Sequence, residues 1–268
     1  MMIPSEQSLL VSSDPLNGAR NISADGSSFE IQLSPELHIP AEAKGITVAM
    51  ETAQVWWTVS NVDSTNNKFY ITAPDANDVS TAYTVTIPNG LYNLSALNTA
   101  ILRELSNQGA KSGVVSLSPD EATQRVNIRI NTLLTSIDFT QANTVRFLLG
   151  FDAVVLGAFA TVPVETLASN VAQFDTIQYF QIHTDLISNG IRTNNAYTQT
   201  IGNVLIDRAP GRNLISTPFN PARIASNELA DAKRTTIRFW LTDQRNKLVN
   251  TNSEYWSARI VIRYLIPV

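Results

Sequence analysis

Two stretches near the C-terminus decide the fold. Residues 236–243 have the sequence TIRFWLTD, and residues 260–266 have the sequence IVIRYLI. In the first stretch Ile, Phe and Leu alternate with Arg and Trp, which is the period of a β-strand with one face in a core. The second stretch is apolar at both parities, as expected for a strand that lies between a core and a neighbouring layer. Both predict β-strands.

The same alternation recurs along much of the chain. Shorter apolar-polar segments, bounded by turn-forming Gly, Asn, Asp or Pro, occupy residues 29–33, 46–50, 55–59, 177–183 and 204–206. Long connections rich in Gly, Pro and Asn separate them, notably residues 207–225. Many short strands with irregular connections favour an all-β antiparallel sandwich. A parallel sheet is disfavoured because strands do not alternate with long helices.

The middle of the chain has a different pattern. Leu94, Leu97, Ile101 and Leu105 recur at spacings of three and four, which predicts an amphipathic helix that Asn93 can cap. Strand candidates lie on both sides of it, and a second, short helix precedes a glycine. These candidates occupy residues 69–71, 83–87, 114–117, 126–130, 137–139 and 143–149. We therefore predict an outer β-sandwich domain of residues 1–61 and 158–268, interrupted by a small inserted α+β domain of residues 62–157. A continuous two-domain chain is the alternative.

The composition excludes several classes of function. The chain of 268 residues has a formal net charge of −4, and 16% of its residues are charged, against about 25% in average soluble proteins. Neutral polar residues must therefore cover its surface. Direct nucleic-acid binding is disfavoured because it needs a basic stripe that displaces counterions. The absence of cysteine excludes disulfides, zinc ribbons and thiol catalysis.

Two segments bear on membranes and targeting. Residues 1–14 lack the basic and apolar regions of a secretory signal, and we expect them to form a polar arm. Residues 147–163 (FLLGFDAVVLGAFATVP) are the most apolar stretch, but they fall short of the roughly 20 residues that span a bilayer. We expect this stretch to be buried in the protein or in a contact with another chain.

Motifs for chemistry are weak. The chain has only two histidines, His38 and His183, and a triad of His183 with Asp185 is less favoured than a strand-end histidine bonded to a loop. Residues 75–78 (DAND) lack the glycine and terminal glutamate of a calcium loop. Residues 109–113 (GAKSG) follow a helix and lack the spacing of a phosphate-binding loop. We expect no catalytic residue, no cofactor and no metal site.

Adjacent tryptophans give the sharpest candidate site. Trp56 and Trp57 point to opposite faces if they lie on one strand, so only one can enter a given core. The other must pack on a loop, stack on a ligand or lie in a subunit interface, where Trp is enriched. Packing or an interface is favoured over sugar binding.

Several motifs together resemble a known family. They are IPNGLYNLSAL at 87–97, RFLLGF at 146–151, IHTDL at 182–186, PGR at 210–212 and TIRFWLTD at 236–243. In this order they resemble jelly-roll capsid proteins of icosahedral double-stranded DNA viruses related to adenovirus, tailless membrane-containing phages and virophages. The likeness is closest to the penton (vertex) or minor capsid type.

The resemblance implies a structural, non-enzymatic virion protein with a jelly-roll sandwich. It implies self-association as a homopentamer and contacts with neighbouring major capsid proteins, a vertex spike or an internal membrane. The N-terminal arm would tie one subunit to another. The alternatives are a double jelly-roll major capsid protein that forms trimers, a receptor- or glycan-binding spike module, and, least favoured, a jelly-roll hydrolase. Cupins are disfavoured because their metal site needs several histidines.

Overall fold

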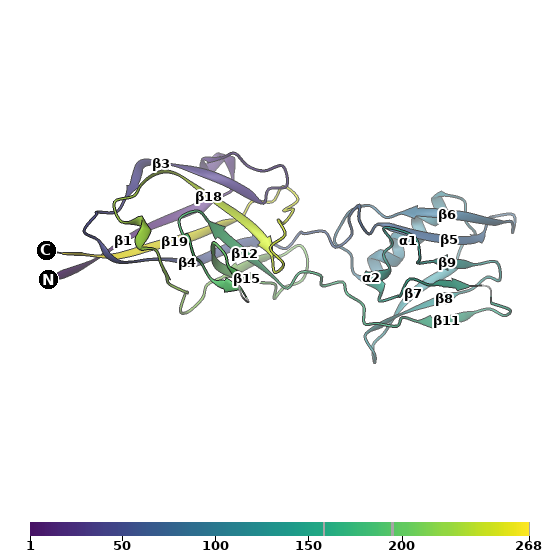
Figure 1. The fold of residues 1–268 in the computed structure, drawn as a ribbon. Helices are drawn as coiled ribbons and strands as arrows, with labels where there is room; N and C mark the ends of the chain where they lie inside the picture. Colours follow the sequence, from purple (N-terminus) through teal and green to yellow (C-terminus); the bar gives the residue numbers. More distant parts are fainter. Residues whose placement is uncertain (158, 194–195, 268) are drawn as a thin grey trace. The chain divides into compact units, whose positions relative to one another are not determined.

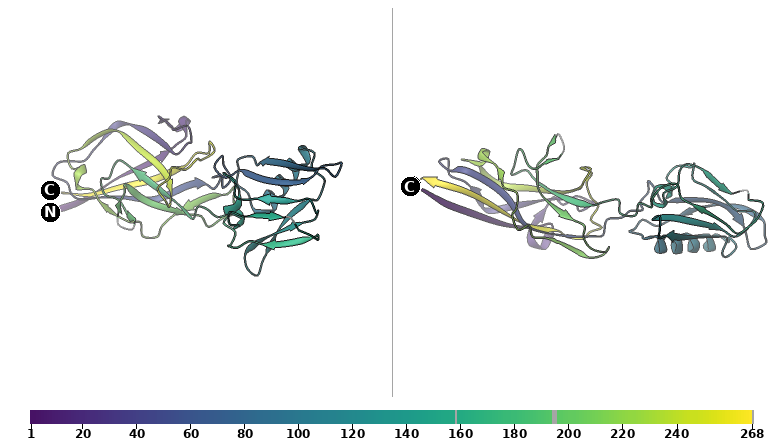
Figure 2. Two further views of the ribbon diagram at one scale, coloured as in Figure 1. Left: turned by 45° about the vertical axis from the view of Figure 1, so that its right-hand side comes forward. Right: turned by 90° about the horizontal axis from the view of Figure 1, so that it is seen from below.

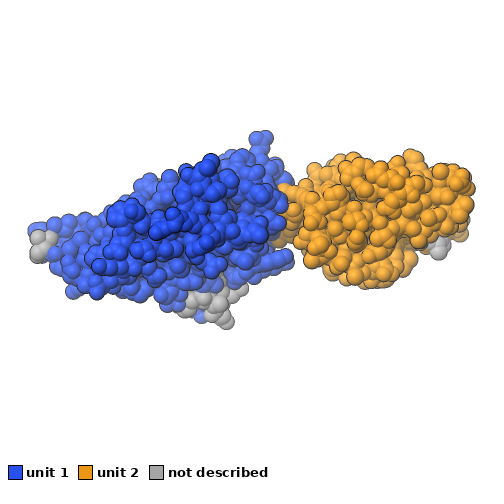
Figure 3. Space-filling view, turned by 90° about the horizontal axis from the view of Figure 1, so that it is seen from above, with its two compact units in different colours: residues 1–59, 177–268 blue, residues 60–176 orange. Residues whose placement is uncertain are grey.

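The structure is a computed structural model that describes residues 1–157, 159–193 and 196–267. The chain divides into two compact units (Figure 3). Unit 1 consists of Met1–Val59 and Ile177–Val268, and unit 2 of Ser60–Thr176. The two units are described separately.

Unit 1 consists of two antiparallel sheets (Figure 1). Sheet A has the order β1 (Met2–Ser12), β19 (Ser257–Pro267), β4 (Lys44–Trp56) and β16 (Asn213–Ser216), and β17 (Ile224–Ala225) also pairs with β4. Sheet B has the order β15 (Thr200–Leu205), β12 (Tyr179–Thr184), β18 (Lys233–Asp243), β3 (Ser28–His38) and β2 (Ala19–Arg20). Smaller elements are the 3-10 helices η1 (Pro15–Asn17) and η2 (Asn227–Leu229) and the pair β13 (Arg192–Thr193) and β14 (Ala196–Tyr197).

The strand order identifies the architecture. Counted along the chain, the eight main strands of unit 1 are β1, β3, β4, β12, β15, β16, β18 and β19. Sheet A then has the order 1-8-3-6 and sheet B the order 2-7-4-5. Two antiparallel sheets connected in this way form a jelly-roll sandwich. The predicted fold class is confirmed, and the chain of unit 2 is inserted between the third and fourth strands.

Aromatic side chains fill the space between the two sheets. The rings of Phe29 and Phe239 stack at 5.6 Å between centroids, and Trp256 meets Phe29 edge-on at 4.9 Å. Trp57, which follows β4, packs against Phe180 of β12 at 5.9 Å. All five side chains are buried. Residues of β3, β12 and β18 in sheet B therefore pack against Trp57 and Trp256, which flank β4 and β19 of sheet A.

The sequence predicts a polar arm at the N-terminus. The structure instead places this segment in sheet A as β1. β1 pairs with β19 along its whole length, from Met2 opposite Pro267 to Ser12 opposite Ser257. Among the residues of β1, only Val11 is fully buried, so the strand has almost no apolar alternation. Backbone pairing with β19 sets its place in the sheet. The pattern of side chains along the sequence does not indicate such pairing.

Unit 2 has an α+β arrangement. Its sheets have the orders β10 (Val155–Gly157), β9 (Ser136–Asp138), β5 (Lys68–Pro74), β6 (Ser80–Thr86) and β11 (Val164–Leu167), β8 (Arg125–Ile130), β7 (Val115–Asp120). Its helices are α1 (Leu94–Asn107) and α2 (Arg146–Leu149). Figure 2 shows α1 against one face of these strands.

The helix signals in the sequence correspond to these helices. α1 buries Leu97, Ile101 and Leu105, and the side chain of Asn93 accepts a hydrogen bond from the Ala96 amide at 2.8 Å. α2 ends at Gly150, which has a φ of 78°. Among the described residues no helix is long and apolar enough to cross a membrane.

The boundary of the insertion differs from the sequence estimate of 157. β11 pairs with β8, so the residues up to Thr176 belong to unit 2. The strand orders of unit 2 are not those of a jelly roll, so the described chain contains one jelly roll and not two in tandem. Whether the two units fold as independent domains stays a prediction.

Replacing Phe239 by Ala tests this core. We expect Phe239→Ala to lower the free energy of unfolding by about 3–5 kcal/mol, because it leaves a cavity between the sheets. The matched control is Leu248→Ala in the same unit, whose side chain is half exposed, with a change within about 0.5 kcal/mol. Denaturant unfolding followed by tryptophan fluorescence measures both, since all four tryptophans lie in unit 1. Equal losses in the two variants would contradict this packing.

Candidate assembly surfaces

The two adjacent tryptophans occupy different environments. Trp57 is 3% exposed and packs in the core of unit 1, whereas Trp56 is 37% exposed on the outer face of sheet A. Trp56 lies opposite Asn213 of the edge strand β16. Trp57 is therefore not available to a ligand or a partner. An interface or stacking role for Trp56 stays a proposal.

Trp56 belongs to a larger apolar surface. β15 and β16 are edge strands of sheets B and A, and the Ser216 hydroxyl donates a hydrogen bond to the Asn203 carbonyl between them. Exposed apolar side chains on or beside these edges are Trp56, Leu205, Ile215 and Phe219, and we name this surface the β16 side. Phe219 is the most exposed of them. Of these residues, the sequence pattern points only to Trp56. The sequence feature that marks Phe219 is its place between Pro218 and Pro221 in an uncharged segment.

A second apolar surface lies at the other edges of the sheets. β1 and β2 are the edge strands there, and Ile3, Leu10 and Leu16 are exposed on or between them. We name this surface the β1 side. Most soluble monomers scatter exposed apolar residues singly. In unit 1 the exposed aliphatic and aromatic residues gather mainly at two opposite edges of the sandwich.

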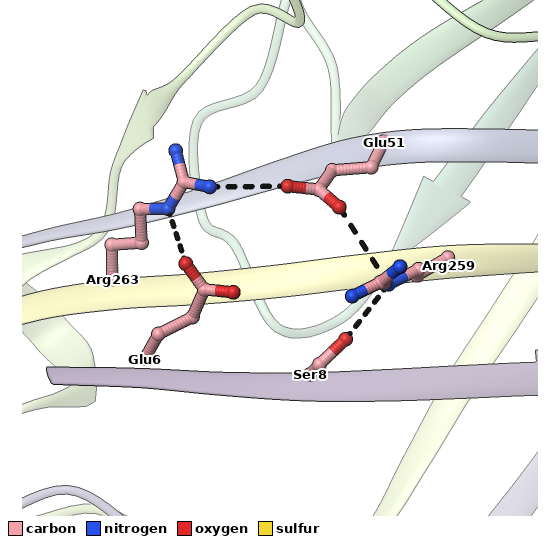
Figure 4. A network of polar contacts seen from close by, with 5 residues as sticks. All are labelled: Glu6, Ser8, Glu51, Arg259 and Arg263. Atoms are coloured by element: carbon pink, nitrogen blue, oxygen red, sulfur yellow. Dashed lines mark hydrogen bonds and ion pairs between the residues drawn. The ribbon is translucent and has the colours of Figure 1, made fainter.

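Charged groups occupy the outer face of sheet A between these edges (Figure 4). Arg263 donates to Glu6 at 2.7 Å and to Glu51 at 3.1 Å, and Arg259 lies 3.6 Å from Glu51. These contacts join β1, β19 and β4. The hydrogen bond and the charge of Glu6 raise the pKa of Arg263 above its ordinary value. The groups neutralise one another across three strands, so they add little net charge to this face.

The network also explains the two-sided apolar pattern of residues 260–266. Val261 lies between Arg259 and Arg263 along β19 and is 1% exposed, although the core-facing residues are Ile260 and Ile262. The aliphatic stems of long charged side chains cover apolar surface in this way. We infer that the stems of Arg259 and Arg263 cover Val261 and take the place of the neighbouring layer expected from the sequence.

His183 does not form a catalytic arrangement. Its Nε2 lies 2.7 Å from the Thr242 hydroxyl and its Nδ1 lies 3.1 Å from the Thr200 hydroxyl, so both ring nitrogens have partners. The ring stacks on Trp240 at 5.3 Å. Asp185 instead accepts a hydrogen bond from the backbone amide of Arg238. The triad considered for His183 and Asp185 is therefore not present.

The two loops considered for ions are occupied by local bonds. The Asp75 carboxylate accepts hydrogen bonds from the Asn77 and Val79 amides at 2.8 Å, and the bond from Val79 is the main reason that its pKa is lowered. Asp78 pairs with Lys111, which lies beyond the helix exit at Gly109. The described residues contain no group of three or more His, Cys, Asp or Glu arranged to hold a metal.

Unit 2 also exposes apolar side chains. The stretch 147–163 is only partly buried: Leu148, Leu149 and Phe151 lie in the core, but Phe147 and Val155 are more than half exposed. The Arg146 guanidinium lies 4.2 Å from the centre of the Phe147 ring. Residue 158 lies outside the described residues. The exposed part is a second candidate for contact with another chain.

The comparisons with known proteins are sparse. A family model described as "Bacterial Ig-like domain" matches residues 6–108. This is less than half of the chain, and the match crosses from β1 in unit 1 to α1 in unit 2, so it covers neither unit. No curated protein matches the sequence.

Solved structures give a further likeness. Of 21 matching chains, one is the crystal structure of SeMet-labelled mavirus penton protein. It has 10% sequence identity and a TM-score of 0.47, over 98% of this chain and 99% of that chain. A likeness at this level is not evidence of function.

The buried histidine predicts a specific dependence of stability on pH. Burial lowers the pKa of His183 from 6.5 to about 4. Between these values the unfolded chain binds a proton that the folded chain does not, so stability falls as the pH falls from 6.5 towards 4. We expect a loss of about 2 kcal/mol between pH 7 and pH 5.

Urea unfolding at pH 7, 6 and 5 measures this loss. His183→Gln, which keeps hydrogen-bonding groups near both threonines, should be less stable at pH 7 but nearly independent of pH in this range. The exposed His38 provides the control, because His38→Gln should retain the wild-type dependence. A wild-type stability that stays flat down to pH 5 would rule out the neutral, buried state of His183.

Proposed function

We propose that this protein is a structural virion protein that forms the penton (vertex) capsomer, or a minor capsid component, of an icosahedral shell. The observation that carries the proposal is the β16 side together with the β1 side: one jelly roll with apolar side chains at opposite edges. A fold alone does not imply a function, so the proposal rests on these surfaces and on the sequence resemblance.

The two edges favour association between copies of the chain. A contact between different surfaces of identical subunits is heterologous, and repeated contacts of this kind close into a ring when the rotation allows. A ring of jelly rolls is the arrangement expected of a capsomer. The low charge of the chain supports this reading, because charged side chains are depleted from interface cores.

The exposed apolar residues of unit 2 and the proposed location in the virion suggest further partners. We propose that the capsomer lies in the virion capsid and contacts neighbouring major capsid proteins, with the exposed Phe147 and Val155 of unit 2 in those contacts. A vertex spike or an internal membrane is a further proposed partner. We propose no enzymatic activity, no cofactor and no direct contact with nucleic acid.

The mass of the native protein tests the assembly. Light scattering on a sizing column, over a range of protein and salt concentrations, should give about 147 kDa for five chains of 29.4 kDa each. About 88 kDa, for three chains, would replace the penton by a trimeric capsid protein. A monomer at every concentration would contradict a self-assembling capsomer.

Truncating Trp56 tests its place in the interface. We expect Trp56→Ala to weaken association by roughly 10-fold or more, because buried tryptophans dominate many interfaces. The matched control is Leu248→Ala, an exposed apolar residue that pairs with Thr242 of β18, a strand inside sheet B. Equal association constants for the wild type and Trp56→Ala would remove Trp56 from the interface. Trp57→Ala is unsuitable because it opens the core.

One observation supports a glycan-binding spike as the second candidate. The side chain of Trp56 is 37% exposed on the outer face of sheet A. A partly exposed tryptophan ring is a surface on which a sugar can stack. The apolar Leu205, Ile215 and Phe219 around it favour a protein partner instead. Glycan-array binding that is lost in Trp56→Ala would favour the spike module.

A further inference from the structure

Phe219 forms a projecting group on the β16 side. It lies in the segment 217–221 (TPFNP) that connects β16 to β17, and its side chain is fully exposed. Both flanking strands pair with β4, which fixes the ends of the connection. Pro218 and Pro221 restrict the backbone between them. An aromatic side chain held out on a restricted loop loses little conformational entropy when it binds.

A hollow of suitable chemistry lies on the β1 side. It has a volume of about 510 Å³ and is lined by the aliphatic side chains of Leu10, Ile31 and Leu33. Polar lining comes from Ser12, Asn17, Gln32 and Ser257, and no lining residue is charged. Leu10 is 81% exposed within the single chain. The lining is of mixed polarity, and its three aliphatic side chains offer apolar surface to an aromatic ring.

Another hollow, on sheet A, is less suitable. It has a volume of about 400 Å³, but Glu6, Arg223 and Arg263 line it. Placing a phenyl ring there would remove charged groups from water without giving them new partners. The segment 217–221 is itself uncharged. The uncharged projection at Phe219 therefore suits the uncharged hollow on the β1 side.

The topology places the projection and the hollow on opposite sides of unit 1. β16 and β1 are the two ends of the order β1-β19-β4-β16 in sheet A. We infer that Phe219 of one copy inserts into the hollow formed by Leu10, Ile31 and Leu33 of a second copy of this chain. The contact is heterologous, so each copy offers one projection and one hollow, as a closed ring requires. This inference rests on the proposed capsomer and names its subunit contact.

Engineered cysteines test the contact directly, because the chain has none of its own. Asn220→Cys places a thiol beside the projection, and Gln32→Cys places one at the hollow. In an equimolar mixture under mild oxidation, the two single variants should form a covalent dimer on a non-reducing gel, and neither variant alone should. The double variant should form a ladder that ends at the number of chains found by light scattering.

Phe219→Ala supplies an independent measurement. We expect it to weaken association by roughly 30-fold, the loss typical of an interface hot spot, and Phe219→Tyr to retain most of the affinity. Val79→Ala, an exposed apolar residue of unit 2, is the control that should not change it.

The possible results separate this inference from the capsomer itself. Oligomers that form without the mixed cross-link, and that Phe219→Ala leaves unchanged, would overturn the contact but retain the capsomer. Cross-linking of either single variant with itself, at the yield of the mixture, would replace it by a symmetric contact. A protein that stays monomeric and uncross-linked would overturn both proposals.

Discussion

The pairing of β19 with both β1 and β4 is the interaction on which the rest of unit 1 depends. It joins the two ends of the chain, since Met2 lies opposite Pro267, and it places the last strand between the first strand and the third. Closing so large a loop costs entropy that only the completed sheet offsets. Sheet A therefore forms only when the C-terminal strand β19 has paired with β1 and β4. Once β19 is in place, the edges of the sheet are fixed as β1 and β16.

Those edges decide what the surface can do. A β-sandwich has edge strands that must be covered, charged or interrupted if the protein is to stay single. Here the charges of Glu6 on the edge strand β1 and of Glu51 on β4 are neutralised by Arg259 and Arg263 of β19. The exposed apolar side chains of unit 1 lie mainly on the β1 side and the β16 side. This distribution leaves the edges poorly protected against association. The proposed assembly uses these edges as its contacts.

Much of the fold was predictable from side-chain periodicity, because periodicity records which face is buried. Val55, Trp57 and Val59 share one parity, and all three are buried, so the strand pattern itself indicates that Trp56 faces outward. The same logic located α1. It failed for β1, whose place depends on backbone pairing, and for β11, whose partner β8 lies more than thirty residues earlier. The β1 side and Phe219 were not predictable either, since they arise from edges that only the topology defines.

The buried polar groups on the outer face of sheet B show a different balance. His183, Thr200 and Thr242 are buried with their polar atoms bonded to one another, and Trp240 covers the imidazole ring. Burying a polar group costs free energy unless it is hydrogen-bonded, and this set meets that condition only while the imidazole is neutral. These hydrogen bonds therefore stabilise the folded state near neutral pH and lose that contribution in acid. The aromatic contacts between the sheets carry no charge to titrate. For a subunit held in an assembly, this acid sensitivity lies in sheet B and reaches the β16 side, because Thr200 belongs to the edge strand β15.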